Sequence, residues 1–352
     1  MVRKFLCLSI LLSIFWLGFS NSVQAAGDGE SKTGFILPHV MDNYEWHFAT
    51  IGHTHVTLPL PVIIYSPDQG LEFFLSSNFQ NHETHKFGKD YGVNGYYIDE
   101  NYKLHAADES RTFYDFSITK NVMMMFIVIA VLLFLMLNSA KFYKRNPGTA
   151  PKGIASFIEP IVIFVRDEIA LPNIGHKKYL KFTPYLLTLF FFIWVGNILG
   201  LFPEAANFTG NIALTFTLAI FTFIITNVNG NKDYWKHVFA TPGVPVPLLL
   251  IIVPVEIIGL FTKPFALMVR LFVAITAGHI VILSFVSLIF IFGQMSTVAG
   301  WGFSPVSIAF SVFIYVIELL VAFIQAFIFT NLTAVFIGQA FEHGDHHEGG
   351  HH

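Results

Sequence analysis

Residues 247–292 form the segment that decides the fold, and they read PLLLIIVPVEIIGLFTKPFALMVRLFVAITAGHIVILSFVSLIFIF. A single helix of this length would measure about 69 Å. That is more than twice the roughly 30 Å thickness of the hydrocarbon core of a bilayer. A second apolar segment, 305–340, would measure about 54 Å as one helix. Either each segment splits into two spans or each forms one long, tilted helix. Between Gly259 and Val281, Pro264 is the only candidate break, and proline can kink a span without ending it. We therefore expect two long, tilted C-terminal helices.

The composition is that of a membrane protein. Of the 352 residues, 54% are hydrophobic and 40 are phenylalanine, and the mean hydropathy is +0.61. Only 12% are charged, against about 25% in a typical soluble domain. The net charge of −3 provides no basic surface for nucleic acid. The single cysteine, Cys7, excludes disulfide bonds within the chain and cysteine-based metal sites.

Hydropathy and charge predict an all-α membrane domain over residues 121–340. Basic residues follow the first span, at Lys141, Lys144 and Arg145, which places its C-terminal end in the cytoplasm. Residues 154–170 combine apolar and charged positions and are expected to form an interfacial amphipathic helix. The chain is predicted to have its N-terminus outside, its C-terminus in the cytoplasm, and five spans, at about 122–140, 182–202, 210–228, 247–292 and 305–340.

The two ends of the chain differ from this membrane domain. Residues 1–25 have a basic start, a short apolar stretch and small residues at the end, which is the pattern of a cleaved signal peptide. Residues 26–120 predict a small extracytoplasmic segment that is irregular or rich in β-structure. Its histidine pairs, His53/His55 and His82/His85, are candidate metal ligands or simply polar surface residues. The C-terminal tail, 341–352, is rich in histidine and expected in the cytoplasm.

Ionisable residues are rare in the two long apolar segments. A charge at the centre of a bilayer costs between about 2.5 and 17 kcal/mol, so such residues usually face a polar path or a partner. Arg270 lies in the middle of its segment, and helical spacing places Ala266, Ala274 and Ala277 beside it. Small side chains allow another helix to approach closely. Arg270 is therefore predicted to face a partner helix that carries the matching anion.

A candidate proton path accompanies this arginine. Glu318 and Gln325 are seven residues apart and share one face of a helix. His279 lies nine residues after Arg270, and histidine titrates near neutral pH. Arginine cannot relay protons because its pKa exceeds about 12. The sequence thus predicts a titrating path beside a cation that keeps its charge.

Three motifs resemble those of subunit a of the F-type ATP synthases. They are Lys263-Pro264-Phe265-Ala266-Leu267-Met268-Val269-Arg270-Leu271-Phe272 followed by Ala277-Gly278-His279, then Gln325-Ala326-Phe327-Ile328-Phe329, and Trp194-Val195-Gly196-Asn197-Ile198-Leu199-Gly200-Leu201-Phe202-Pro203. The resemblance covers roughly residues 120–340.

The resemblance implies a bacterial inner-membrane subunit that is not an enzyme on its own and needs no cofactor or metal. Its partners would be a ring of c subunits, the b-type peripheral stalk and the rest of the ATP synthase. Protons would enter past His279, Glu318 and Gln325 and leave through a second half-channel past Glu256. Arg270 would separate the two half-channels and couple proton flow to rotation.

Two positions depart from the family pattern. Val273-Ala274 stands where the family usually has Gly-Asn after Arg-Leu-Phe, which removes a polar group near the arginine. His279 and Glu318 occupy positions where the family usually carries the acid and the histidine, respectively. The pair is exchanged between helices, and both chemical groups are kept.

Two other classes of protein fit parts of the sequence. In a secondary transporter, Arg270 would bind an anionic substrate, although such folds usually contain internal repeats, and none is apparent here. In a membrane-anchored metal-binding protein, the histidines of 26–120 would carry the function.

Overall fold

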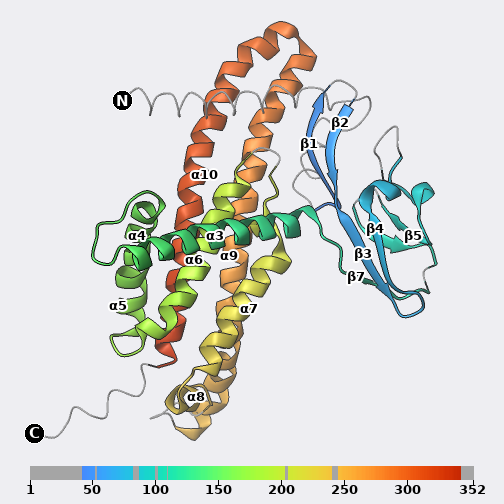
Figure 1. Cartoon of the computed structure of the whole chain (residues 1–352). Helices are drawn as coiled ribbons and strands as arrows, with labels where there is room; N and C mark the ends of the chain where they lie inside the picture. Colours follow the sequence, from blue (N-terminus) through green and yellow to red (C-terminus); the bar gives the residue numbers. More distant parts are fainter. Residues whose placement is uncertain are drawn as a thin grey trace, which may run out of the picture. The chain divides into compact units, whose positions relative to one another are not determined.

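The computed structural model describes residues 42–51, 54–81, 87–99, 102–108, 110–202, 205–239 and 245–341. Their helices and strands are drawn in Figure 1, and they divide into two units. Of the described residues, those within 42–126, 200–208 and 279–313 belong to unit 1, and those within 127–199, 209–278 and 314–341 belong to unit 2. The predicted signal peptide, His53, His82, His85 and the tail 342–352 lie outside the described residues.

The segment predicted to be extracytoplasmic, residues 26–120, contains β-structure in its described part, within unit 1. Sheet β4-β3-β7 is antiparallel, and two further pairs, β1 with β2 and β5 with β6, are also antiparallel. Short 3-10 turns η2 (Ser76–Phe79) and η3 (Lys89–Tyr91) connect them. The strands are β1 (Glu45–Ile51), β2 (Thr54–Pro59), β3 (Pro61–Ser66), β4 (Gly70–Leu75), β5 (Tyr96–Ile98), β6 (Leu104–Ala106) and β7 (Tyr114–Asp115).

Alternation along β3 explains how this small core forms. Val62 and Ile64 are fully buried, while Tyr65 between Ile64 and Ser66 is exposed, as expected for a strand with one covered face. The buried side chains of β3 pack with Tyr96, Ile98 and Phe79. Tyr44 also joins this core, and its hydroxyl donates a hydrogen bond to Asp115. Burial is the main cause that raises the pKa of the Tyr44 hydroxyl, and the hydrogen bond to Asp115 raises it further.

Unit 2 contains helices around one large apolar core. The segment Ile154–Ile174 is a continuous helix made of α4 (Ile154–Phe164), a π-helical stretch η4 (Val165–Ala170) and α5 (Leu171–Ile174). Its side chains Ile158, Val165 and Ile169 are buried in the core with Leu186 and Phe190 of α6 (Tyr179–Gly200). The predicted helix 154–170 is therefore present but ends later, at Ile174, where Gly175 follows.

Three more helices complete the region before the long hairpin. These are α3 (Lys120–Arg145), α7 (Ile212–Val228) and α8 (Lys232–Phe239). The axes of α7 and α8 differ by 105°. The sequence does not predict α8, because its eight residues are polar on average.

The two long helices are confirmed, and the connection between them is shorter than predicted. Helix α9 (Val246–Met295) contains 50 residues, including Pro254 and Pro264, and α10 (Thr297–Gln339) contains 43. Only Ser296 separates them, and α10 begins at Thr297, eight residues before the predicted span 305–340. Pro305 lies inside α10; a proline there removes a backbone hydrogen bond and can kink a membrane helix without ending it.

Helices α9 and α10 are antiparallel neighbours within each unit. In unit 1, Phe285 stacks on Phe310 with ring centroids 5.5 Å apart, and Ser307 donates a hydrogen bond to the carbonyl of Phe285. In unit 2, Lys263 Nζ donates to Gln339 Oε1 at 3.0 Å. The described residues contain four helices that are long and apolar enough to cross a membrane, or five if the bent pair α7 and α8 is one span.

Candidate functional site

The segment of α9 around Arg270 has two distinct faces. Leu267, Met268, Leu271 and Ile275 are buried in the core of unit 2. Their spacing of three to four residues defines one side of a helix. Arg270 lies to one side of that face and is exposed. The apolar residues of this motif therefore fix the helix against the core and leave the arginine outside it.

Small and apolar residues accompany Arg270 on the exposed side. Ala266, Val273 and Ala277 are exposed, and Ala274 is partly buried. Within the described part of the chain, the Arg270 guanidinium has no ion pair or hydrogen bond. We name residues 266, 270, 273 and 277 the arginine stripe. The stripe presents one positive charge on a surface that a second helix can approach closely.

Glu318 lies on the α10 side of the helix hairpin and contacts the backbone of α9. It is 3% exposed, while its neighbours Ile317 and Leu319 are 42% and 47% exposed. A Cβ atom placed on Gly278 would be 2.5 Å from Glu318 Oε1 and 2.9 Å from its Cδ. A side chain at position 278 would therefore require the Glu318 carboxyl to move. The glycine of the Ala-Gly-His motif thus brings Glu318 against the turn of α9 that precedes His279.

The other predicted path residues are placed as follows. His279 is the next residue after Gly278 in α9 and is partly buried. Gln325 lies two turns after Glu318 in α10 and is partly buried. Glu256 lies nearer the start of α9 and is also partly buried. Their roles in proton movement stay predictions.

Asn197 of α6 is a buried polar residue that the sequence analysis did not single out. It is 2% exposed. Its Oδ1 accepts a hydrogen bond from Thr209 Oγ1 at 2.8 Å, and its Nδ2 donates to the Ala322 carbonyl at 3.4 Å. Ala322 is one turn after Glu318, so Asn197 ties α6 to the part of α10 that carries the carboxylate. The signal was present, since Asn197 belongs to the Trp194–Pro203 motif.

A line of hydroxyl groups connects three helices further along unit 2. The Tyr185 hydroxyl is 3.2 Å from Thr222 Oγ1, and Thr222 Oγ1 is 3.3 Å from Thr333 Oγ1. These residues come from α6, α7 and α10. Hydroxyl pairs between helices were not predicted, because isolated threonines in an apolar helix carry no periodic signal.

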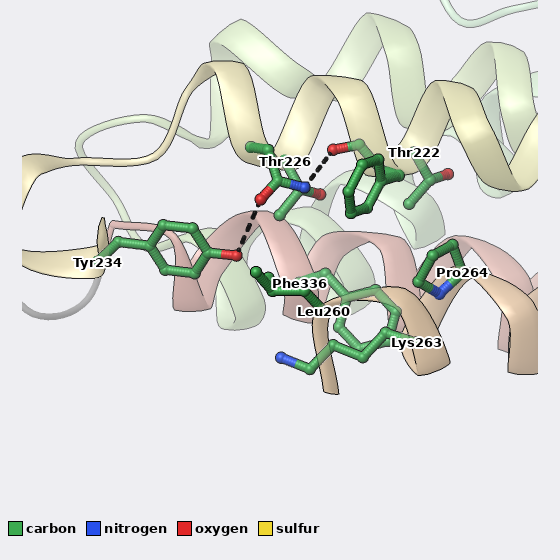
Figure 2. A pocket seen from close by; sticks show the side chains of 9 residues that line it. Thr222, Thr226, Tyr234, Leu260, Lys263, Pro264 and Phe336 are labelled. Carbon is green, nitrogen blue, oxygen red and sulfur yellow. Dashed lines mark hydrogen bonds between the residues drawn. The ribbon is translucent and has the colours of Figure 1, made fainter. Parts of the chain in front are cut away.

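Figure 2 shows a small cavity where α7, α8, α9 and α10 meet. Its volume is about 20 Å³, and about 10–15 Å³ measured this way is enough for one water molecule. Tyr234 donates to Asn227 Oδ1 at 3.2 Å beside it. The hydroxyl oxygen of the buried Thr226 makes no hydrogen bond within the described residues. The cavity is lined by Thr222, Phe223, Thr226, Asn227, Tyr234, Leu260, Lys263, Pro264 and Phe336.

The described residues hold no group of three or more histidine, cysteine, aspartate or glutamate side chains that could bind a metal ion. Of the four predicted histidines, His55 alone lies within the described backbone, in β2. The metal site therefore stays a prediction for residues outside the described part of the chain.

Comparison with known proteins identifies the membrane region. The family of the ATP synthase A chain matches residues 122–338. The chain belongs to this family. The same residues contain the arginine stripe, Gly278 and Glu318, so these features lie inside the part shared with the ATP synthase A chains. Membership also confirms the resemblance drawn from the motifs and removes the support for a secondary transporter.

Several relatives are similar over most of their length. ATP synthase subunit a of Chloroherpeton thalassium is 49% identical over 244 residues, which cover 68% of this chain and 71% of that protein. ATP synthase subunit a of Chlorobium phaeobacteroides strain DSM 266 is 45% identical over 336 residues, covering 93% of this chain and 81% of the relative. In Anaeromyxobacter dehalogenans, ATP synthase subunit a is 46% identical over 243 residues, covering 66% and 60%.

The β-structure matches a different family. Residues 35–124 match a family described as a domain of unknown function (DUF8433). This match ends at the start of α3, where the ATP synthase A chain match begins. The ATP synthase A chain region is therefore preceded by a separate module whose task the comparison does not name.

Proposed function

We infer that this chain is the stationary proton-conducting subunit of a rotary ATP synthase, with Arg270 separating two half-channels. The observation that carries this proposal is the exposed Arg270 on the arginine stripe, with no anion beside it among the described residues. A ring of c subunits that carries one carboxylate per subunit would supply the missing anion. The b-type stalk would hold the chain still while the ring turns.

The charge of Arg270 accounts for proton release. At an effective dielectric constant of about 20, a carboxylate about 4 Å away would gain about 4 kcal/mol, against about 1 kcal/mol in water. A neighbouring cation lowers the pKa of a carboxylate by about 1–3 units. A ring carboxylate that reaches Arg270 would therefore lose its proton there. Because arginine stays charged, it would also block a direct leak between the half-channels.

The outer half-channel is proposed to pass His279, Glu318 and Gln325. The contact between the Glu318 carboxyl and Gly278 supports this route, because it brings a buried acid against the turn of α9 that leads to His279. Histidine and glutamate can each take up and pass on a proton. In this protein the two groups keep their chemistry after the exchange of positions between α9 and α10.

The inner half-channel is proposed to pass Glu256 and the cavity in Figure 2. Leu260 and Lys263, one and two turns after Glu256, line that cavity. The buried Thr226 hydroxyl offers a partner for a water molecule in the cavity. Such a water would give a proton a polar step between the α9 surface and the cytoplasmic loop.

Synthesis by the whole complex in vesicles tests the role of Arg270. Arg270→Ala is expected to abolish ATP synthesis and to allow passive proton leak. Arg270→Lys is expected to lose most synthesis as well, because a buried ammonium can give up its proton. Val273→Ala, on the same stripe, is the matched control and is expected to keep synthesis near the wild-type rate. Wild-type synthesis by Arg270→Ala would overturn the mechanism.

A further inference from the structure

One face of sheet β4-β3-β7 carries large apolar side chains that the described residues of unit 1 leave exposed. Tyr65 of β3 and Tyr114 of β7 are cross-strand partners with ring centroids 6.4 Å apart. Phe116 follows β7 and donates its backbone N–H to Ile63 at 2.8 Å. We name this surface the aromatic face; its members and exposed fractions are Tyr65 42%, Leu71 54%, Phe73 66%, Leu75 50%, Tyr114 59% and Phe116 62%.

The strand alternation separates this face from charge. Glu72, between Leu71 and Phe73, turns to the other side of β4 and accepts a hydrogen bond from Asn94 at 3.1 Å. Asp115, between Tyr114 and Phe116, accepts the hydrogen bond of the buried Tyr44. The carboxylates next to the face are thus held on the opposite side of the sheet.

The size of the aromatic face exceeds what an ordinary protein surface leaves open. Six large side chains at these exposed fractions amount to roughly 670 Å², taking about 200 Å² for one such side chain. The largest apolar patch of a typical soluble monomer is about 300–600 Å², and larger ones mark contact with a protein or a membrane. The face therefore needs an occupant.

The chain enters the membrane helix α3 directly beside this face. Lys120, the first residue of α3, is four residues after Phe116, so the two are at most about 14 Å apart along the chain. Backbone hydrogen bonds fasten this junction to the β-structure: Ile118 N–H donates to Pro61 at 3.1 Å, and Lys120 N–H donates to Asn43 at 2.9 Å. Asp42 Oδ2 also accepts from Thr119 Oγ1 at 2.8 Å. The junction is a built connection that holds the sheet close to the start of the helix (Figure 1).

We propose that the aromatic face lies against the outer surface of the lipid bilayer, next to the point where α3 enters it. Tyrosine and tryptophan side chains are enriched at this depth because their rings are apolar and their polar ends meet water. The bilayer is the proposed partner because the hydrogen-bonded junction holds the sheet close to the start of α3. The six residues of the aromatic face carry no positive charge that would favour an anionic partner. The inference rests on the proposed function only in that α3 crosses the membrane.

Site-directed fluorescence in the assembled complex tests this surface. Phe73→Cys, made in a Cys7→Ser background and labelled with an environment-sensitive dye, reports on the face in liposomes. Asp90→Cys is the matched control, because Asp90 is exposed in η3, on the β5 side of the core. Leu133→Cys, exposed on α3, reports whether that helix is in lipid. Each label is quenched either by lipid-attached nitroxide or by iodide in the outer solution.

The expected pattern is a blue-shifted label at position 73 that nitroxide lipids quench and iodide does not. The label at position 90 should show the reverse. A label at 73 that iodide reaches would overturn the proposal, since the face would then be in water. A label at 73 protected from both quenchers would also overturn it, because protein would then cover the face. If lipid-attached nitroxide does not quench the label at 133, α3 does not cross the membrane. This result distinguishes a failure of the proposed topology from a failure of the proposed contact between the aromatic face and the bilayer.

Discussion

At the scale of single residues, Gly278 is the position where the smallest change has the clearest consequence. A methyl group there would lie 2.5 Å from Glu318 Oε1, so Gly278→Ala must push the carboxyl away from α9. We expect the variant to assemble but to lose most ATP-driven proton pumping, measured by quenching of a pH dye in inverted vesicles. Gly259→Ala in the same helix meets nothing within 4 Å and should pump normally. Normal pumping by Gly278→Ala would show that the position of the Glu318 carboxyl is unimportant.

The chemistry of Glu318 itself gives a second prediction. Glu318→Gln keeps the size of the side chain and a hydrogen-bonding end, but the glutamine amide cannot release or take up a proton near neutral pH. Pumping is expected to fall strongly, while the amount of assembled complex in the membrane stays unchanged. Glu318→Asp should keep part of the activity, because it retains a carboxyl. Full pumping by the glutamine variant would remove Glu318 from the path.

At single residues, the sequence indicates candidate groups but not how they are arranged. Charge in an apolar segment singles out Arg270, Glu256 and Glu318 as candidates, and their roles in proton movement stay predictions. The seating of Glu318 on Gly278 could not be predicted, because it depends on the register between α9 and α10. Register is set by packing along the whole hairpin, and no periodic pattern in either helix encodes it.

At the scale of elements, hydropathy predicted where helices cross but not where they end. Helix α3 was expected over 122–140 and continues to Arg145, because lysine and arginine are good helix formers that need no apolar surroundings. The short connection at Ser296 was missed for a related reason. Residues 293–304 are rich in glycine and polar residues, which favour a loop locally, while the contact between the two helices supports helix instead.

Asn197 supplies the prediction that belongs to helix packing. Asn197→Ala removes the hydrogen bonds to Thr209 and Ala322 and leaves the Thr209 hydroxyl buried without this partner. Hydrogen bonds between membrane helices are worth about 1 kcal/mol or less. We expect a loss of about 1 kcal/mol in the free energy of unfolding, measured by equilibrium denaturation of the purified chain in mixed detergent.

Thr188→Ala is the matched control for Asn197. Thr188 is exposed on the same helix and donates only to the carbonyl of Pro184, at 2.9 Å. Its loss should change the free energy of unfolding by no more than a few tenths of a kcal/mol. Equal effects of the two substitutions would mean that Asn197 does not tie α6 to α10.

At the scale of the whole molecule, the chain joins two modules that are similar to different protein families. The β-structure matches one family and the helices another, and the boundary falls at the start of α3. Composition alone located that boundary near residue 120, because the polar and the apolar parts of the sequence differ so strongly. The β-strands could be predicted only as a tendency, and the pairing of β3 with β7 joins segments far apart in the chain.

The topology gives the last prediction, and it follows from charge. Eight lysine and arginine residues lie between 141 and 181, and such loops stay in the cytoplasm because moving them across the membrane is costly. Two exposed positions report on opposite ends of α3: Asp90 before it and His176 after it. In a Cys7→Ser background, Asp90→Cys should react with an impermeant maleimide in right-side-out cells, and His176→Cys only in inverted vesicles. Labelling of both from one side would mean that α3 does not cross the bilayer. Arg270 would then lie at a different depth from the one the proposed mechanism requires.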